Sequence, residues 1–209
     1  MSEIVFGSSD AAAAYKIKKM LKGHQIKKIS PRLYTTNFTD EISVIIRRNL
    51  FKILSNLYPE AVLSHRSAFE IKPTITNQIF VTHSYTKKIR LPGITINFLE
   101  GKGPDEDDIK IIGNFYASSR ERAFLENLQM TKKSRPDSKA LGYQDIKERL
   151  KKIFILYGKA ELENIREKAR YLSESLIMKR EYDLLDKIIN ELIPEQTEAE
   201  NEPEYHSLL

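Results

Sequence analysis

The side chains that could most directly take part in a reaction lie in the run Ser64-His65-Arg66-Ser67, where two hydroxyl groups flank an imidazole. A hydrolytic nucleophile needs such a hydroxyl beside a base, and an acid that orients the base. Here the residues are neighbours at an expected helix start, where side chains rarely point to a common centre, and no orienting acid is evident. We therefore interpret Ser64 as a helix cap and expect no catalytic residue and no enzymatic activity.

The loop GKGPDEDD at residues 101–108 is the strongest candidate for binding a metal or a nucleotide. Its acids lack the alternating oxygen ligands and the closing glutamate of an EF-hand. Gly101 and Gly103 lack the third glycine and the following helix of a dinucleotide site. The chain has no cysteine, which excludes disulfides, thiol nucleophiles and cysteine-ligated zinc. We expect a solvated loop, no metal and no cofactor.

Basic residues offer a different kind of chemistry. Residues 11–39 contain seven lysine or arginine residues and no acid, a local field that attracts a polyanion. The net charge of the 209 residues is +5, and the stretch after Pro194 carries five glutamates without a lysine or arginine, so residues 1–193 carry +10. This contrast predicts a basic ordered body followed by an acidic, disordered tail at 194–209.

Periodicity places most of these cations on one helix. Ser8 or Ser9 is expected to cap it and Gly23 to end it. Its apolar side holds Ala13, Ile17, Met20 and Leu21. The residues expected to face a nucleic-acid groove are Ala11, Ala12, Tyr15, Lys18 and Lys19, and those expected to meet phosphates are Lys22, Lys27, Lys28 and Arg32. An ordinary solvated lysine face remains the alternative.

A short hairpin is predicted at residues 25–36, turning at Ser30-Pro31. A helix followed at once by a basic hairpin is typical of a recognition helix and its wing. A full winged helix-turn-helix has two earlier helices, for which the seven residues before Ser8 leave no room. We therefore expect a reduced, winged-helix-like unit at 1–39.

The middle of the chain predicts mixed secondary structure. Residues 40–58 read as one long helix, and residues 61–72 as a short strand followed by a helix. Strands with antiparallel character are expected in 78–85, 87–91, 94–101 and 109–116, followed by a helix from Ser118 or Ser119. Lys87, Lys88 and Arg90 form a second basic spot, which either protects a sheet edge or extends a nucleic-acid footprint.

The polar stretch 132–141 predicts a linker, after which residues 143–192 have almost continuous helical periodicity. The expected class is α+β, with a winged-helix-like unit at 1–39, a mixed antiparallel-sheet domain at 40–131, and a helical bundle or docking arm at 142–193. No signal peptide and no apolar run of about 18 residues is found, so we expect a soluble, cytoplasmic protein that does not contact membranes.

Several stretches carry a resemblance to known bacterial proteins. The runs GHQIKKISPRLYTT, IIRRNLFKIL and YPEAVLSHRSAFEI resemble the AbiEi family of antitoxins from type IV toxin–antitoxin systems. That family joins a winged-helix DNA-binding unit to a mixed α/β domain. Residues 4–190 also resemble the region before the catalytic domain of some Fic-family proteins, through VFGSSD, AVLSHRSAFE, YTKKIRLPGI and SRERAFLENLQ. No histidine begins the Fic catalytic motif HPFxxGNGR, so the resemblance implies no adenylylation.

The resemblance implies a transcriptional regulator of antitoxin-like type whose partner is DNA. The sequence allows two alternatives. The chain could act as an interaction module that binds a toxin or a Fic enzyme through residues 142–193. It could also be the separated N-terminal part of a Fic-family protein.

Overall fold

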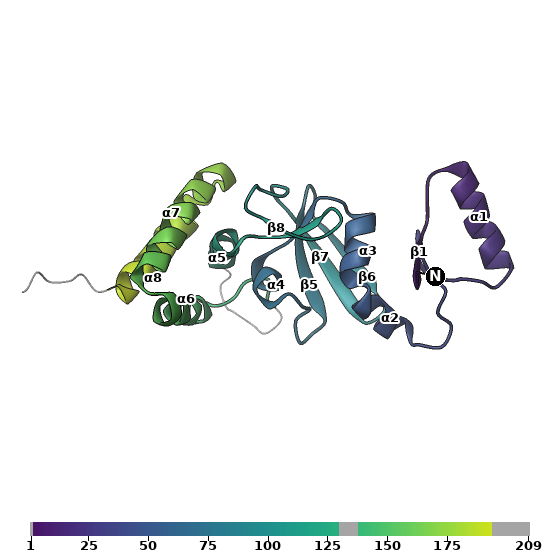
Figure 1. Ribbon diagram of the computed structural model, residues 1–209, viewed down its shortest axis with the longest axis horizontal. Coiled ribbons are helices and arrows are strands. Elements are labelled where there is room, and N and C mark those ends of the chain that lie inside the picture. Colours follow the sequence, from purple (N-terminus) through teal and green to yellow (C-terminus); the bar gives the residue numbers. More distant parts are fainter. Residues whose placement is uncertain (1, 130–137, 194–209) are drawn as a thin grey trace, which may run out of the picture.

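Helices and sheets alternate in layers along the longest axis of the molecule (Figure 1). The computed structural model describes residues 2–129 and 138–193 and has an α+β fold, as expected. The acidic tail at 194–209 and residues 132–137 of the expected linker lie outside the described residues. Helix α1 lies at one end of the molecule and helices α6, α7 and α8 at the other, with a six-stranded sheet between them.

The N-terminal unit is a helix combined with a three-stranded antiparallel sheet. Its elements are β1 (Ile4–Phe6), α1 (Ala11–Lys22), β2 (Lys27–Ser30) and β3 (Leu33–Thr35), and the strand order is β1-β3-β2. The predicted helix and hairpin are confirmed, whereas β1 was not anticipated. Helix α1 begins after Asp10, whose carboxylate accepts a hydrogen bond from the Ala13 amide at 2.8 Å. The cap is therefore Asp10 and not Ser8 or Ser9.

One face of this small sheet shares a core with the middle of the chain. Ile4 and Leu33 are buried in the same apolar cluster as Ile45 and Ile46, and Phe6 packs against that cluster. Cross-strand partners lie on one face of a sheet, and Phe6 pairs with Leu33. The helical segment that contains Ile45 and Ile46 therefore packs against the N-terminal unit.

That helix is not continuous, so the prediction of a single helix over 40–58 is wrong. The structure has α2 (Ile42–Arg48) and α3 (Leu50–Leu57), separated at Asn49. The Asn49 side-chain amide donates to the Ile45 carbonyl at 2.8 Å and to Glu3 Oε2 at 2.6 Å. A side chain that bonds a carbonyl one turn earlier competes with the regular helical pattern, and here it accompanies the break.

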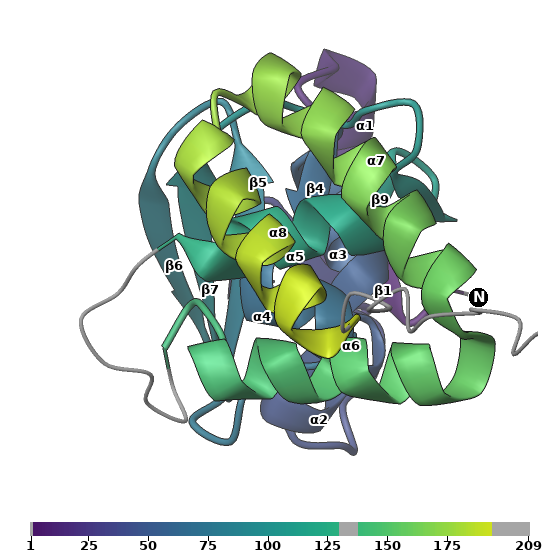
Figure 2. The same ribbon diagram turned by 90° about the vertical axis from the view of Figure 1, so that its left-hand side faces the viewer.

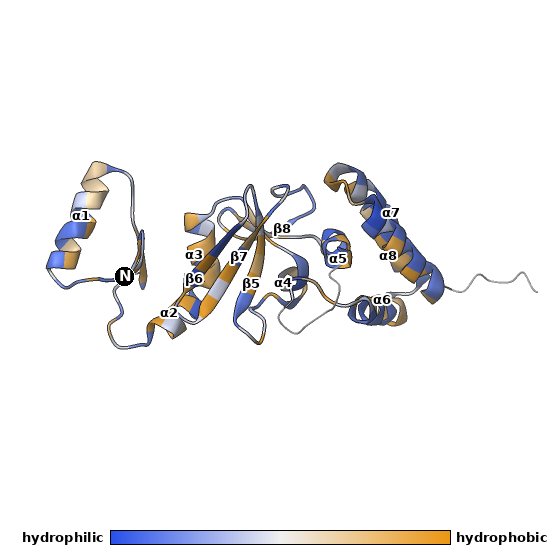
Figure 3. Cartoon of the chain, turned by 180° about the vertical axis from the view of Figure 1, so that it is seen from behind, coloured by the Kyte–Doolittle hydropathy of each residue, from blue (hydrophilic) through white to orange (hydrophobic). Residues whose placement is uncertain are grey.

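The large sheet has the strand order β6-β7-β5-β4-β9-β8. Its pairings are mixed: β5 pairs parallel with β7 and β4 pairs parallel with β9, whereas the other three strand pairs are antiparallel. The expected last strand over 109–116 is a hairpin of two strands. The bounds are β4 Ala61–Leu63, β5 Gln78–His83, β6 Lys87–Leu91, β7 Ile94–Glu100, β8 Ile109–Ile112 and β9 Phe115–Ala117. Figure 3 shows β5, β7 and α3 as mainly hydrophobic elements.

Two short helices cover the opposite face of this sheet from α2 and α3 (Figure 1). They are α4 (His65–Glu70) and α5 (Arg120–Leu128), and eight of the nine residues of α5 are buried. Phe124, Leu125 and Leu128 of α5 belong to one apolar cluster with the C-terminal helices. Helix α5 therefore lies between the sheet and the C-terminal helices.

The C-terminal helices are α6 (Tyr143–Tyr157), α7 (Lys159–Leu176) and α8 (Lys179–Leu192). Figure 2 shows them in front of α5 and the sheet. Most of the predicted apolar positions are buried in their shared core, among them Ile146, Leu162, Ile165 and Ile188. Leu156 is an exception, since 70% of its surface is exposed.

Candidate nucleic-acid interface and a buried polar network

The outer face of α1 consists of the residues that the helical periodicity places there. Ile17 is buried, whereas Tyr15 is 71% exposed. The other members of this face are also exposed, and they are Ala11, Ala12, Lys18, Lys19 and Lys22. Among the residues that the structure describes, no carboxylate lies within 4.0 Å of Lys16, Lys18, Lys19 or Lys22. The face is therefore cationic without internal compensation.

The hairpin cations do not lie together on this face. Lys27 and Lys28 are consecutive in β2, so their side chains leave opposite faces of the sheet. Lys28 is paired with Tyr34, whereas the Lys27 ammonium lies 5.8 Å from the centre of the Phe38 ring. Of this pair, Lys28 is the exposed residue. The structure thus separates two residues that were predicted to meet phosphates together.

Arg32 lies at the hairpin turn, where its φ is +60°. Its carbonyl accepts a hydrogen bond from the Gly7 amide at 2.8 Å, and a side chain at Gly7 would meet Arg32 Cα at 2.9 Å. Arg32 also lies close enough to Tyr58 at the end of α3 to oppose the rise in the pKa of that phenol. The hairpin turn therefore faces the middle of the molecule.

An ionic cluster holds the N-terminal unit against α2. The Arg48 guanidinium pairs with Glu3 in a bidentate manner, with Nε donating to Oε2 at 2.8 Å, and it pairs with Asp40 at 2.6 Å. Asn37 also donates to Glu3 Oε1 at 2.8 Å. The hydrogen bond from Arg48 lowers the pKa of Glu3 to about 2. This cluster fixes β1 relative to the α2 helix.

The second basic spot lies on β6, an edge strand of the large sheet. Lys87 pairs with Phe98 of β7, and Lys88 pairs with Asn97. Phe98 is buried in the core on the α3 side, so Lys87 leaves the α3 side of the sheet, and Lys88 and Arg90 leave the other. The edge placement of these residues agrees with the role of charge in protecting a sheet edge.

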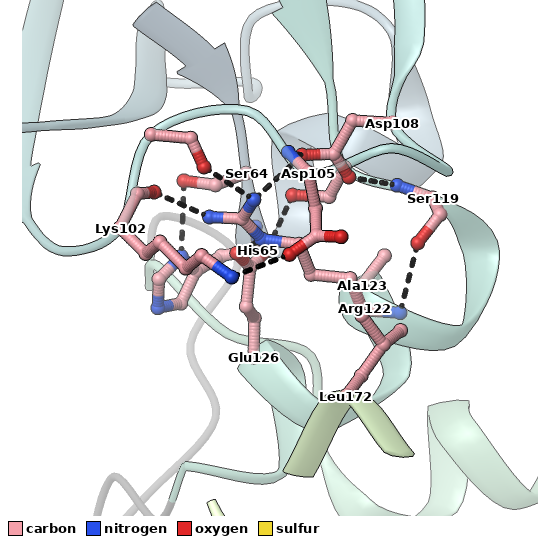
Figure 4. A network of polar contacts seen from close by, with 12 residues as sticks. Ser64, His65, Lys102, Asp105, Asp108, Ser119, Arg122, Ala123, Glu126 and Leu172 are labelled. Atoms are coloured by element: carbon pink, nitrogen blue, oxygen red, sulfur yellow. Dashed lines mark hydrogen bonds and ion pairs between the residues drawn. The ribbon is translucent and has the colours of Figure 1, made fainter. Parts of the chain in front are cut away.

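A buried arginine lies at the centre of a polar network on the face of the large sheet opposite to α2 and α3 (Figure 4). Arg122 of α5 is 1% exposed and pairs with Asp108 at 2.6 Å and with Glu126 at 2.9 Å. It also donates to the carbonyls of Lys102 and Gly103, at 2.7 and 2.9 Å. Burial raises the pKa of Asp108, against the opposing effect of Arg122. A buried charge is tolerated when it is paired and hydrogen-bonded in this way.

The prediction of a solvated loop at 101–108 is therefore wrong at Asp108, which is buried and accepts a hydrogen bond from the Ser119 amide at 2.8 Å. The Asp105 amide also donates to Asp108, at 2.9 Å. Arg122 was not identified from the sequence, because an arginine in an amphipathic segment is normally assigned to the surface. The repeated acids of the loop and Glu126 one helical turn after Arg122 were the available signals.

Ser64 and His65 belong to the same network, but not as a nucleophile and base. Ser64 is the N-cap residue of α4, but its side chain makes no capping hydrogen bond to the helix. Its Oγ lies 3.1 Å from His65 Nδ1. His65 Nε2 lies 3.2 Å from Gln129, while Glu126 accepts from the His65 backbone amide at 2.9 Å. The carboxylate therefore does not orient the imidazole. Burial lowers the pKa of His65, which favours its neutral form.

The described residues provide no group of three or more histidine, aspartate or glutamate residues that could hold a metal ion. No helix within 2–129 and 138–193 is long and apolar enough to cross a membrane. Comparisons with protein-family models, with curated proteins and with solved structures found no match for this chain.

Proposed function

We propose that the chain is a DNA-binding transcriptional regulator of the antitoxin-like type, without a catalytic role. The observation that carries the proposal is the outer face of α1, where Lys18, Lys19 and Lys22 are exposed and lack carboxylate partners among the described residues. This face lies at one end of the molecule (Figure 1). A cationic helix that projects in this way can enter a groove of DNA without a clash with the other layers.

The face combines two properties that DNA contact requires. Ala11 and Ala12 are small, so the first turn of α1 can approach base edges, and Tyr15 adds a ring one turn later. The lysines in the following turns reach phosphates, with Lys28 on the hairpin as a further contact. If about five phosphates are neutralised, the logarithm of the binding constant falls with the logarithm of salt concentration with a slope of about −4 to −5.

The test is the binding of the full chain to the DNA upstream of its own gene, measured by fluorescence anisotropy at several salt concentrations. The double substitution Lys18→Glu with Lys19→Glu is expected to abolish the rise in anisotropy on addition of the protein. A matched control is Lys151→Glu with Lys152→Glu on α6, which changes the net charge equally at the other end of the molecule. Equal binding by the α1 variant and the wild type, or a salt-independent signal, refutes the proposal.

A second candidate function is the binding of a protein partner, such as a toxin or a Fic enzyme, through the C-terminal helices. Three consecutive large apolar residues at the end of α6 are exposed, namely Ile155 (69%), Leu156 (70%) and Tyr157 (66%). Exposed apolar side chains in a contiguous group are typical of interaction sites.

This candidate is tested by co-expression with the product of a neighbouring gene that encodes a nucleotidyltransferase or a Fic domain. Ile155→Glu with Leu156→Glu is expected to abolish co-purification and to leave DNA binding unchanged. The exposed aromatic residue on α7 offers a control, since Tyr171→Glu lies outside the apolar group. Co-purification that survives the α6 substitutions excludes this surface.

A further inference from the structure

A cavity of about 360 Å³ lies between the tip of the N-terminal hairpin and the middle of the molecule. Ser30 and Pro31 form one wall, and the other walls come from α3, the Tyr58 that follows it, and β6. The volume falls within the range of about 300–1,000 Å³ that is common for small-molecule sites. The apolar lining consists of Ile53, Leu57, Ile89, Leu91 and Ile96.

An aromatic group lies beside this apolar lining. The Tyr58 ring is 4.6 Å from the Phe98 ring, and Phe98 is also 5.8 Å from Tyr85. Burial raises the pKa of Tyr58, helped by Tyr85, so this phenol remains neutral at physiological pH. The ring of Tyr58 thus offers a flat apolar surface and a hydroxyl to a ligand.

Three cations of β6 line the cavity, namely Lys87, Lys88 and Arg90, and Arg32 lies beside it, next to the lining residue Pro31. Lys87 lines the cavity and leaves the sheet on the α3 side, as do Ile89 and Leu91, because these residues pair with Phe98, Ile96 and Ile94. Arg32 follows Pro31 and acts electrostatically on Tyr58. In the described part of the chain, neither Arg32 nor Lys87 has a carboxylate within 4.0 Å.

We propose that this cavity binds a small planar aromatic acid, whose ring packs between Tyr58 and the isoleucine and leucine side chains and whose anionic group meets Lys87 and Arg32. The ring satisfies the apolar walls, and the acid compensates both cations. The site is distinct from the outer face of α1 and does not depend on DNA binding. Because a bound acid would contact both the hairpin tip and β6, it would tighten the packing of the N-terminal unit on the rest of the chain.

The test uses the fluorescent anion 8-anilinonaphthalene-1-sulfonate, titrated into the folded full chain, with salicylate as the competitor. The expected result is one saturable site from which salicylate displaces the probe. Arg32→Gln with Lys87→Gln is expected to weaken binding of the probe tenfold or more, since each charged contact is worth about one power of ten in affinity. The matched control, Lys151→Gln with Lys152→Gln on α6, removes two charges at the other end of the molecule and is expected to change affinity less than about twofold, because neither residue lines the cavity.

Two further variants distinguish binding in the cavity from binding elsewhere on the molecule. Ile89→Trp fills the cavity without loss of charge and is expected to abolish probe binding, with circular dichroism to confirm the fold. Lys18→Glu with Lys19→Glu is expected to leave probe binding unchanged, which separates this site from the DNA proposal. Equal weakening by both charge pairs overturns the proposal. So does unchanged binding in the Ile89→Trp variant, or displacement of the probe by a DNA duplex and not by salicylate.

Discussion

Arg122 is the residue on which the polar contacts behind the large sheet converge. It pairs with two buried carboxylates, and its remaining donors bond two loop carbonyls. The guanidinium matches this role because its planar donors can bond several acceptors in fixed directions. A single side chain thereby fixes the loop after β7 and the start of α5.

Replacement of Arg122 by methionine is expected to destabilise the protein by about 3–5 kcal/mol, because Asp108 and Glu126 would remain buried without a counter-charge. The measurement is the free energy of unfolding in urea. Lys147→Met is the control, since it breaks an ion pair with Glu191 on the surface and is expected to have no measurable effect. A similar loss in both variants would contradict the assigned difference between buried and exposed pairs.

At the scale of secondary-structure elements, β1 depends on a contact made by its neighbouring residue Glu3. The Glu3 carboxylate holds Arg48 and Asn49, and Asn49 separates α2 from α3. The same side chains therefore position the strand and accompany the break in the helix.

The cluster predicts a defined dependence of stability on pH. The pKa of Glu3 is lowered from 4.5 to about 2 in the folded protein. The stabilisation of the folded state by the Glu3 carboxylate is therefore complete above pH 4.5 and is lost as the pH falls toward 2. Glu3→Gln should therefore be less stable than the wild type at pH 6, and the difference should shrink between pH 4.5 and 2. Urea unfolding at a series of pH values measures this difference. A difference that stays constant down to pH 2 would contradict the role of the Glu3 charge.

The elements differ in how far they could be predicted from the sequence. Alternation of Ile94, Ile96 and Phe98 gives β7 its strand pattern, and the spacing of Ile17, Met20 and Leu21 gives α1 its inner face. These patterns are local. Strand β1 has three residues and is defined by pairing with β3, nearly thirty residues later, so no local pattern marks it. The same reason explains why the parallel pairing of β4 with β9 was missed.

The candidate site shows the same limit at the scale of the whole molecule. The outer face of α1 follows from helical periodicity alone, and the structure places those residues together. The separation of Lys27 from Lys28, and the position of Arg32 near Tyr58, depend on how the hairpin packs against the other layers. Whether the face binds DNA remains a prediction that the anisotropy experiment addresses.

The position of α5 between two layers has a consequence for synthesis of the chain on the ribosome. Strand β4 gains its neighbour β9 only after residue 117 has been made, and much of the apolar side of α5 is covered only when α7 and α8 have been added. Until those helices emerge, α5 lacks part of its apolar cover on a nascent chain whose sheet is complete, although Phe69 of α4 can already pack against Phe124. Completion of the fold therefore waits for the last helix, and a chain that ends before α7 presents a surface for chaperones to bind.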